Sequence, residues 1–202
     1  DHYFAQHLIT RIPYMSMKNQ HLLHIYAHPN CLKIMSDRIS EHEDADLISD
    51  EGQEKLVVKS NSISPGDVIE INGYKIKAID TDHDSKHGSI LYLIEYNNKT
   101  LFYATDTREL TEKALDELKN TKLDVLIMDH TFGDVNYSFS HLNRDLFIKQ
   151  INILRDMGIV DDDTLIYGTH ISHDGNGIHE EIDAIAKIYK YRIAYDGMEI
   201  NL

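Results

Sequence analysis

A series of short apolar runs, each ending at or just before a His or an Asp, limits the fold of this chain more than any other feature of its sequence. Runs of roughly four to eight residues, rich in β-branched and aromatic side chains, are typical of strands. A strand end holds a polar side chain rigidly and still exposes it to solvent. The polar residues that mark this pattern are Asp1, His2, His83, Asp106, His141 and His170.

Imidazole and carboxylate side chains together suit borderline divalent metals such as zinc, iron or manganese. Ligands drawn from several strand ends, with room left for water, are typical of a catalytic metal site rather than a structural one. The sequence therefore predicts a catalytic metal site whose ligands come from distant parts of the chain.

The order of the predicted elements indicates an α+β fold. Two hairpins come first, over 68–79 with a turn at Asn72-Gly73 and over 89–105 with a turn at Asn97-Asn98. Helices and strands then alternate, which favours sheets covered by helices. The helices are expected over 109–120, 143–157 and 178–190, and the strands over 123–128, 164–168 and 192–196. In the first part, we expect a helix over 3–12, a strand over 22–28, a helix from Pro29 through Met35, a surface segment over 36–54 and a strand over 56–60.

Composition excludes several classes of protein. The 202 residues carry 34 acids against 20 bases and a net charge of −14, which argues against a surface for nucleic acid or anionic membrane. The one cysteine, Cys31, can form no internal disulfide. No apolar stretch approaches the ~20 residues that span a bilayer. No signal peptide is visible, so the cytoplasm is the default location.

Five motifs in order, of which the last is A-Y-D-G-M-E-I at 194–200, resemble the metallo-β-lactamase-fold hydrolases. That family carries H-x-H-x-D-H, then a lone His, a lone Asp and a late His. Asp1-His2 is similar to the second half of the first motif, His83 to the lone His, and the run Y-A-T-D-T to the segment around the metal-bridging Asp, here Asp106. T-H-I-S-H resembles the late motif and makes His170 the ligand. The chain looks most like the branch that includes the phosphoribosyl cyclic phosphodiesterase of phosphonate breakdown, over essentially all 202 residues.

The resemblance implies an αββα four-layer sandwich, truncated at its N-terminus, with one domain over residues 1–202. The first two His of the hallmark are not in this chain, and we expect the chain to begin inside the motif. Two divalent metal ions, zinc or manganese with iron as a third choice, would then share Asp106. One position would keep Asp1, His2, Asp106 and His170, and the other only His83 and Asp106, with His87 as an alternative to His83. These ligands should converge in space.

By the same resemblance, the chain is expected to hydrolyse a small phosphodiester, either cyclic or open, with a metal-bridging hydroxide. Asp1 could ligate a metal and orient that hydroxide. His141 would stabilise the leaving group or donate a proton to it. Asp129 and His173 would support the ligands from behind.

Each of these residues also has an ordinary structural interpretation. An isolated loop His is usually solvated or caps a helix, and Asp129 could merely flank a helix. We expect His24 and His28 to pack or face solvent, His130 and His179 to lie on the surface, and Tyr167 and Tyr195 to lie in the core. Other functions stay open: a tRNA-processing nuclease of the same fold, a lactonase or thioesterase, or a non-catalytic metal-binding protein. The sequence also leaves a homodimer open.

Overall fold

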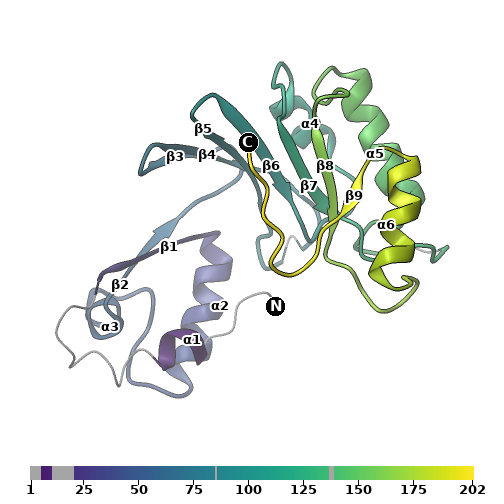
Figure 1. Ribbon diagram of the computed structural model, residues 1–202. Helices are drawn as coiled ribbons and strands as arrows, with labels where there is room; N and C mark the ends of the chain where they lie inside the picture. The colour runs from purple at the N-terminus through teal and green to yellow at the C-terminus, as the bar shows by residue number, and fades with distance from the viewer. Residues whose placement is uncertain (1–5, 11–20, 85, 137–138) are drawn as a thin grey trace. The chain divides into compact units, whose positions relative to one another are not determined.

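The computed structural model describes residues 6–10, 21–84, 86–136 and 139–202, which form two compact units (Figure 1). One unit comprises 1–64 with 84–89, and the other comprises 65–83 with 90–202. The predicted Asp1 and His2 lie outside the described residues. The prediction of one domain over residues 1–202 stays a prediction. Among the described residues, no helix is both long enough and apolar enough to cross a bilayer.

The larger unit is built on a seven-stranded sheet in the order β3-β4-β5-β6-β7-β8-β9. Neighbouring strands are antiparallel from β3 to β6 and parallel from β6 to β9. This mixed arrangement confirms the predicted change from hairpins to α/β alternation. The strands are β3 (Val68–Ile71), β4 (Tyr74–Ile79), β5 (Leu91–Tyr96), β6 (Lys99–Ala104), β7 (Val125–Asp129), β8 (Leu165–Thr169) and β9 (Arg192–Ile193).

Both hairpin turns form as the sequence predicts. Asn72 and Gly73 have φ values of 51° and 85°, and Asn97 and Asn98 have values of 48° and 60°. Left-handed backbone is accessible to Gly and Asn, and its twist matches that of the flanking strands. The turns therefore set the register of β3 with β4 and of β5 with β6.

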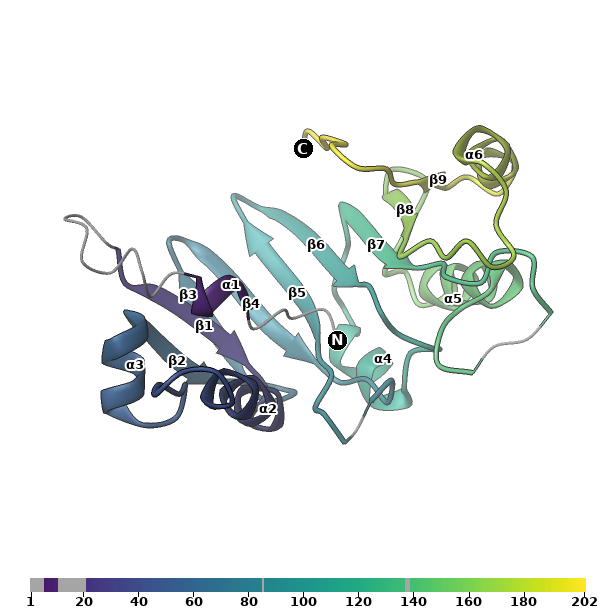
Figure 2. The same ribbon diagram turned by 90° about the horizontal axis from the view of Figure 1, so that it is seen from below.

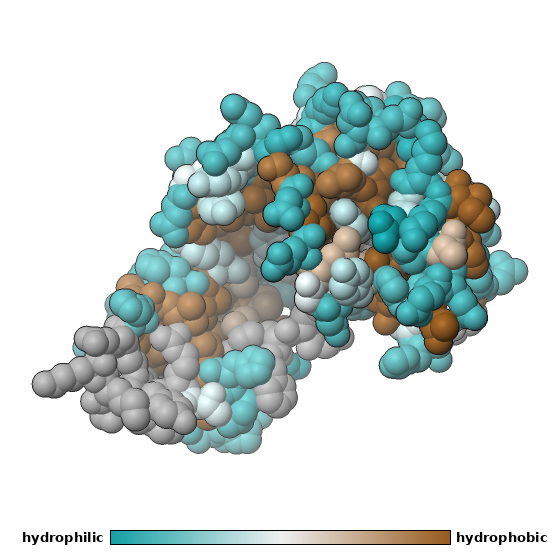
Figure 3. Space-filling view, in the orientation of Figure 1, coloured by the Kyte–Doolittle hydropathy of each residue, from teal (hydrophilic) through white to brown (hydrophobic). Residues whose placement is uncertain are grey.

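Three helices bury apolar side chains in one core cluster with the sheet. They are α4 (Glu112–Leu118), α5 (Arg144–Asp156) and α6 (His179–Ile188). Phe102 and Leu126 of the sheet meet Phe147 and Leu154 of α5 in this core. Helices α4 and α5 lie along the same side of the sheet (Figure 2). Hydrophilic side chains cover most of the visible surface of this unit, with apolar groups showing between them (Figure 3).

The described residues of the smaller unit form a parallel pair of strands and three helices. The strands are β1 (Leu23–Ala27) and β2 (Val58–Ser62), and the helices are α1 (Gln6–Ile9), α2 (Pro29–Ser40) and α3 (Asp50–Leu56). His28 caps α2, because its Nδ1 accepts a hydrogen bond from the backbone N–H of Asn30 at 3.2 Å. This contact satisfies one of the N–H groups that the first turn of a helix leaves without a partner inside the helix.

The prediction of a surface segment over 36–54 is wrong. Helix α2 continues past Met35 to Ser40, and Ile39 and Leu47 are fully buried. The hydroxyl of Ser36 accepts a hydrogen bond from the backbone N–H of Leu47 at 2.9 Å, and Ser49 caps α3. The few apolar residues of this acidic segment therefore lie where a helix and a cap turn them inward, which a count of charges does not reveal.

The last predicted strand, over 192–196, is also too long. Only Arg192 and Ile193 pair with β8, and Tyr195 is 56% exposed rather than in the core. The backbone N–H of Ile193 donates to Asp183 of α6 at 3.0 Å, so a side chain takes up the donor that points away from β8, while the N–H of Ala194 still donates to Gly168 at 2.9 Å. Tyr167 is buried as predicted.

Candidate metal centre

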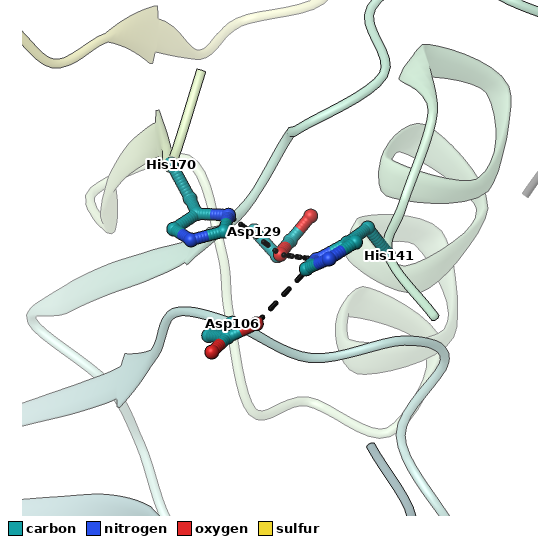
Figure 4. A group of neighbouring side chains, drawn as sticks. All are labelled: Asp106, Asp129, His141 and His170. Carbon is teal, nitrogen blue, oxygen red and sulfur yellow. Dashed lines mark hydrogen bonds and ion pairs between the residues drawn. The ribbon is translucent and has the colours of Figure 1, made fainter. Parts of the chain in front are cut away.

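Four acidic and imidazole side chains meet at one edge of the large sheet (Figure 4). Asp106 follows β6, Asp129 ends β7, His170 follows β8, and His141 lies on the loop between β7 and α5. Because β6, β7 and β8 are parallel neighbours, their carboxyl ends open on the same edge. Each residue offers one ligand-type atom, and these atoms all lie within 4.8 Å of one another.

The backbone is strained at two of the four residues. Asp106 has φ 56° and His170 has φ 62°, in the left-handed region that residues with a Cβ seldom occupy. Such a conformation costs roughly 1–2 kcal/mol. Both residues come just after a strand, where the chain must turn sharply while its side chain points into the cluster. Strain of this kind is typical of functional sites held in place by surrounding structure.

Asp129 is fully buried and has hydrogen bonds to both oxygens. Its Oδ1 accepts from the backbone N–H groups of Thr131 and Leu142, each at 3.0 Å. Its Oδ2 accepts from the backbone N–H of Thr107 at 3.2 Å and lies 2.9 Å from Nδ1 of His141. A carboxylate has about four lone-pair sites. These contacts favour a role for Asp129 in joining two loops behind the ligands, the one after β6 and the one between β7 and α5, rather than in holding an ion itself.

His141 lies between the two carboxylates. Its Nδ1 is 2.9 Å from Oδ2 of Asp129 and 3.5 Å from Oδ1 of Asp106 (Figure 4). Its ring stacks on that of His170, with centroids 5.1 Å apart, and forms a T-shaped pair with that of Phe132. A carboxylate can only accept, so the contact with Asp129 places a proton on Nδ1 of His141.

His170 is oriented by a hydroxyl group. Oγ1 of Thr131 lies 2.7 Å from its Nδ1, and Oδ2 of Asp129 lies 3.6 Å from the same nitrogen. Contacts on Nδ1 make Nε2 the nitrogen through which His170 would ligate an ion. The sequence did not predict a role for Thr131, because a Thr two residues past a strand carries no periodic signal of its own.

His83 contacts Asp106, and His87 instead pairs with Asp84. Nε2 of His83 lies 2.8 Å from Oδ1 of Asp106, and its Nδ1 lies 2.7 Å from the carbonyl oxygen of Ser140. The hydrogen bond with Asp106 raises the pKa of His83, although burial opposes the rise. Of the two His residues that the sequence left open, His83 is the one that lies beside the predicted bridging carboxylate.

The structure corrects the prediction that His130 lies on the surface. The residue is 1% exposed, and its Nε2 lies 2.9 Å from the hydroxyl of Tyr191. Its ring packs on Phe147 and Tyr191, and a Cβ on Gly168 would lie 3.0 Å from that of His130. Burial lowers the pKa of His130 to about 4, so the ring is neutral at pH 7. The side chain after Asp129 points into the apolar core, as alternation along a strand requires.

The remaining predicted residue of the described chain, His173, is exposed on the loop after β8. Its supporting role stays a prediction, as do the roles of Asp1 and His2, which lie outside the described residues.

Comparison with known proteins identifies the family. Residues 1–171 match the model of the β-lactamase superfamily domain, so the chain belongs to that family. No protein of curated function matches the chain significantly. Among solved structures, the metallo-β-lactamase-fold protein YhfI from Bacillus subtilis is 16% identical with a TM-score of 0.66, and covers 98% of this chain and 73% of its own. The predicted metallo-β-lactamase fold is confirmed.

Two further similar structures cover less of their own length. A diphosphatase from the PhnP family is 19% identical with a TM-score of 0.56, over 88% of this chain and 57% of that one. Yeast PDE1 is 15% identical with a TM-score of 0.64, over 93% of this chain and 61% of that one. The chain thus spans less than two thirds of these two proteins.

Proposed function

We propose that the chain is a metal-dependent hydrolase of small phosphodiesters. The observation that carries the proposal is the cluster of Asp106, Asp129, His141 and His170, whose ligand-type atoms lie within 4.8 Å of one another. Similarity to a diphosphatase supports a substrate that is cleaved at a phosphoryl group.

The donor set fits divalent ions such as zinc or manganese. Asp106 and His170 would hold them, with His83 beside Asp106, and Asp1 and His2 as the further ligands that the sequence predicts. Carboxylate and imidazole are the ligands that these metals prefer. When bound, the ions would polarise the phosphoryl group and lower the pKa of coordinated water.

The protein's own groups would orient the ligands and move the proton. Thr131 and Asp129 fix the ring of His170. Asp129 also fixes His141, because it accepts a hydrogen bond from Nδ1. In the protonated ring, the proton that can be donated to the substrate then lies on Nε2. As the P–O bond breaks, the leaving oxygen takes this proton and carries it away as an alcohol.

Substrate hydrolysis by the metal-loaded chain tests the proposal. We expect turnover of bis(4-nitrophenyl) phosphate to exceed that of a lactone and a thioester offered at equal concentration. Hydrolysis of a lactone or thioester without hydrolysis of the phosphodiester would leave the metal site standing and would refute the substrate class.

Variants of the cluster test the roles of its residues. His141→Ala should keep the metal content and lower kcat by about 10²–10⁴, the effect of losing a general acid. Asp106→Ala should lower the metal content and the rate together. His179→Ala, on α6 with its ring against Tyr195, is the matched control and should change neither. If His141→Ala works at the parent rate, His141 is only a residue that flanks a helix.

A further inference from the structure

Two threonine hydroxyls join the loops that bring His83 and Asp106 to the cluster. Thr81 lies two residues before His83 on the loop after β4, and Thr107 directly follows Asp106 on the loop after β6. The Oγ1 atoms of the two threonines lie 2.9 Å apart, in a hydrogen bond to which either hydroxyl can donate. This bond therefore connects two loops that each carry a predicted metal ligand.

Each threonine is also held on its own side of the site. Thr107 is fully buried, and its backbone N–H donates to Oδ2 of Asp129, which also contacts His141. The backbone N–H of His83 donates to Oγ1 of Thr81 at 3.3 Å. The hydroxyl pair therefore connects the backbone of His83 to the buried carboxylate that orients His141.

Two ion pairs also join these loops, but neither can fix them while His83 ligates an ion. Nδ1 of His83 contacts the carbonyl oxygen of Ser140 and so carries a proton, which leaves Nε2 to ligate. Nε2 lies 2.8 Å from Oδ1 of Asp106, and this contact gives way on ligation because a ligating nitrogen carries no proton. Nε of Arg108 lies 3.9 Å from Oδ1 of Asp82, and this exposed pair contributes little.

The hydroxyl pair does not have this weakness. A threonine hydroxyl keeps its proton when a neighbouring imidazole or carboxylate binds a metal, so the bond between the two loops can persist. Each hydroxyl is also restricted by β-branching, which leaves the threonine side chain few rotamers. An ion held by His83 and Asp106 needs both ligand atoms at about 2 Å from one point. A fixed spacing between the two loops favours that arrangement.

We propose that Thr81 and Thr107 are positioning residues for the metal position that His83 and Asp106 form. Their hydroxyl pair holds the two loops at the spacing that ligation needs and thereby raises the affinity of this position for its ion. The inference rests on the metal site of the proposed function, and it does not depend on which ester that site cleaves.

Zinc titration in competition with a chromogenic chelator tests the pair with no substrate present. The titration step that His83→Ala removes marks the position in question. Thr107→Val keeps the shape of the side chain but removes its hydroxyl, and it should weaken that step by about 10- to 100-fold, the range for a group that supports a metal ligand. Thr81→Val should weaken it at least as much, because the N–H of His83 loses its acceptor too. Thr107→Ser keeps a hydroxyl and should restore most of the affinity.

Thr164→Val is the matched control. Thr164 is also buried, and its hydroxyl donates to the carbonyl oxygen of Leu123 at 2.9 Å and accepts from the N–H of Asp161 at 3.0 Å. The five residues of β8 separate it from His170, a distance of about 17 Å along the strand. This variant should lower the urea midpoint of the metal-free chain as Thr107→Val does, and it should leave the zinc affinity unchanged.

A double variant tests whether the two hydroxyls act as one pair. Thr81→Val combined with Thr107→Val should bind zinc no more weakly than Thr81→Val alone, since both changes break the same bond. The inference is overturned if Thr107→Val binds zinc as the parent chain does, or if Thr164→Val loses as much affinity.

Failure of the proposed function would look different. A parent chain that binds zinc at this position but hydrolyses no phosphodiester would refute the substrate class, and the zinc titrations would still decide the roles of Thr81 and Thr107. A parent chain without a titration step that depends on His83 would overturn the inference itself.

Discussion

Replacing Asp129 with Asn tests whether this buried carboxylate organises the cluster. The carboxylate accepts from three backbone N–H groups, those of Thr107, Thr131 and Leu142, and from His141. An amide of the same shape has only one oxygen, and its NH₂ group cannot accept. Asp129→Asn therefore keeps the volume of the side chain and removes half of its acceptor sites.

The amide introduced by Asp129→Asn can point either way round, and the more favourable orientation sets the loss in the free energy of unfolding. With NH₂ in place of Oδ1, two buried backbone donors, Thr131 and Leu142, would face another donor. With NH₂ in place of Oδ2, only the N–H of Thr107 loses its acceptor, and Nδ1 of His141 must switch from donor to acceptor. One buried donor without a partner costs about 1–3 kcal/mol. The two bonds that remain lose their charge assistance, about 1 kcal/mol more. We expect a loss of roughly 2–4 kcal/mol in the free energy of unfolding.

Urea unfolding of the metal-free chain measures this loss without a contribution from bound metal. The control is Asp124→Asn, just before β7, where the carboxylate accepts from the backbone N–H of Thr100 and from Lys99 near the surface. Asp124→Asn should lower the free energy of unfolding by less than about 1 kcal/mol. The amide oxygen can still accept from the backbone N–H of Thr100, and water can solvate the ammonium group of Lys99. The argument is refuted if both variants lose the same small amount. Asp129→Asn should also lower kcat by about 10²–10⁴, because His141 then holds the wrong tautomer.

Two further predictions concern the large unit. Gly175→Ala should destabilise the chain by about 1–3 kcal/mol more than Gly158→Ala. Both glycines have positive φ (80° and 72°), but only at Gly175 would the new Cβ meet obstacles, which are Cγ2 of Val135 and the backbone carbonyl oxygen of Phe132. Equal losses in thermal melts would show that backbone strain alone matters there. Asp183→Asn should destabilise the chain most near neutral pH. Burial raises the pKa of Asp183, but hydrogen bonds from the Arg192 guanidinium and other donors outweigh burial and hold this pKa below its usual value. Stability from such a group is present above the ordinary pKa of about 3.9 and is lost as pH falls through the lower folded value, so the gap between parent and variant should narrow in acid. A difference in stability between parent and variant that does not change with pH would contradict this prediction.

Much of the fold follows from local pattern. The turns at Asn72-Gly73 and Asn97-Asn98 need left-handed backbone, and only a few residue types adopt it readily. Period-two and helical spacing predicted each strand of the large sheet and all three of its helices, with shifts at their ends. The acidic stretch over 36–54 was misjudged because its core contribution comes from a few residues, such as Ile39 and Leu47, whose inward placement depends on tertiary packing.

The sequence by itself determined which chemical groups stand at the strand ends and in which order. Parallel neighbours bring such ends to one edge, so Asp106 and His170 could be expected to meet although they lie far apart in the chain. Only the tertiary structure decided what each group does there. It turned His130 into the core while Asp129 stayed at the edge, and it surrounded Asp129 with donors from two loops. Hydrogen bonds require their atoms to lie within a few tenths of an ångström of ideal distance, and no one-dimensional pattern carries that information.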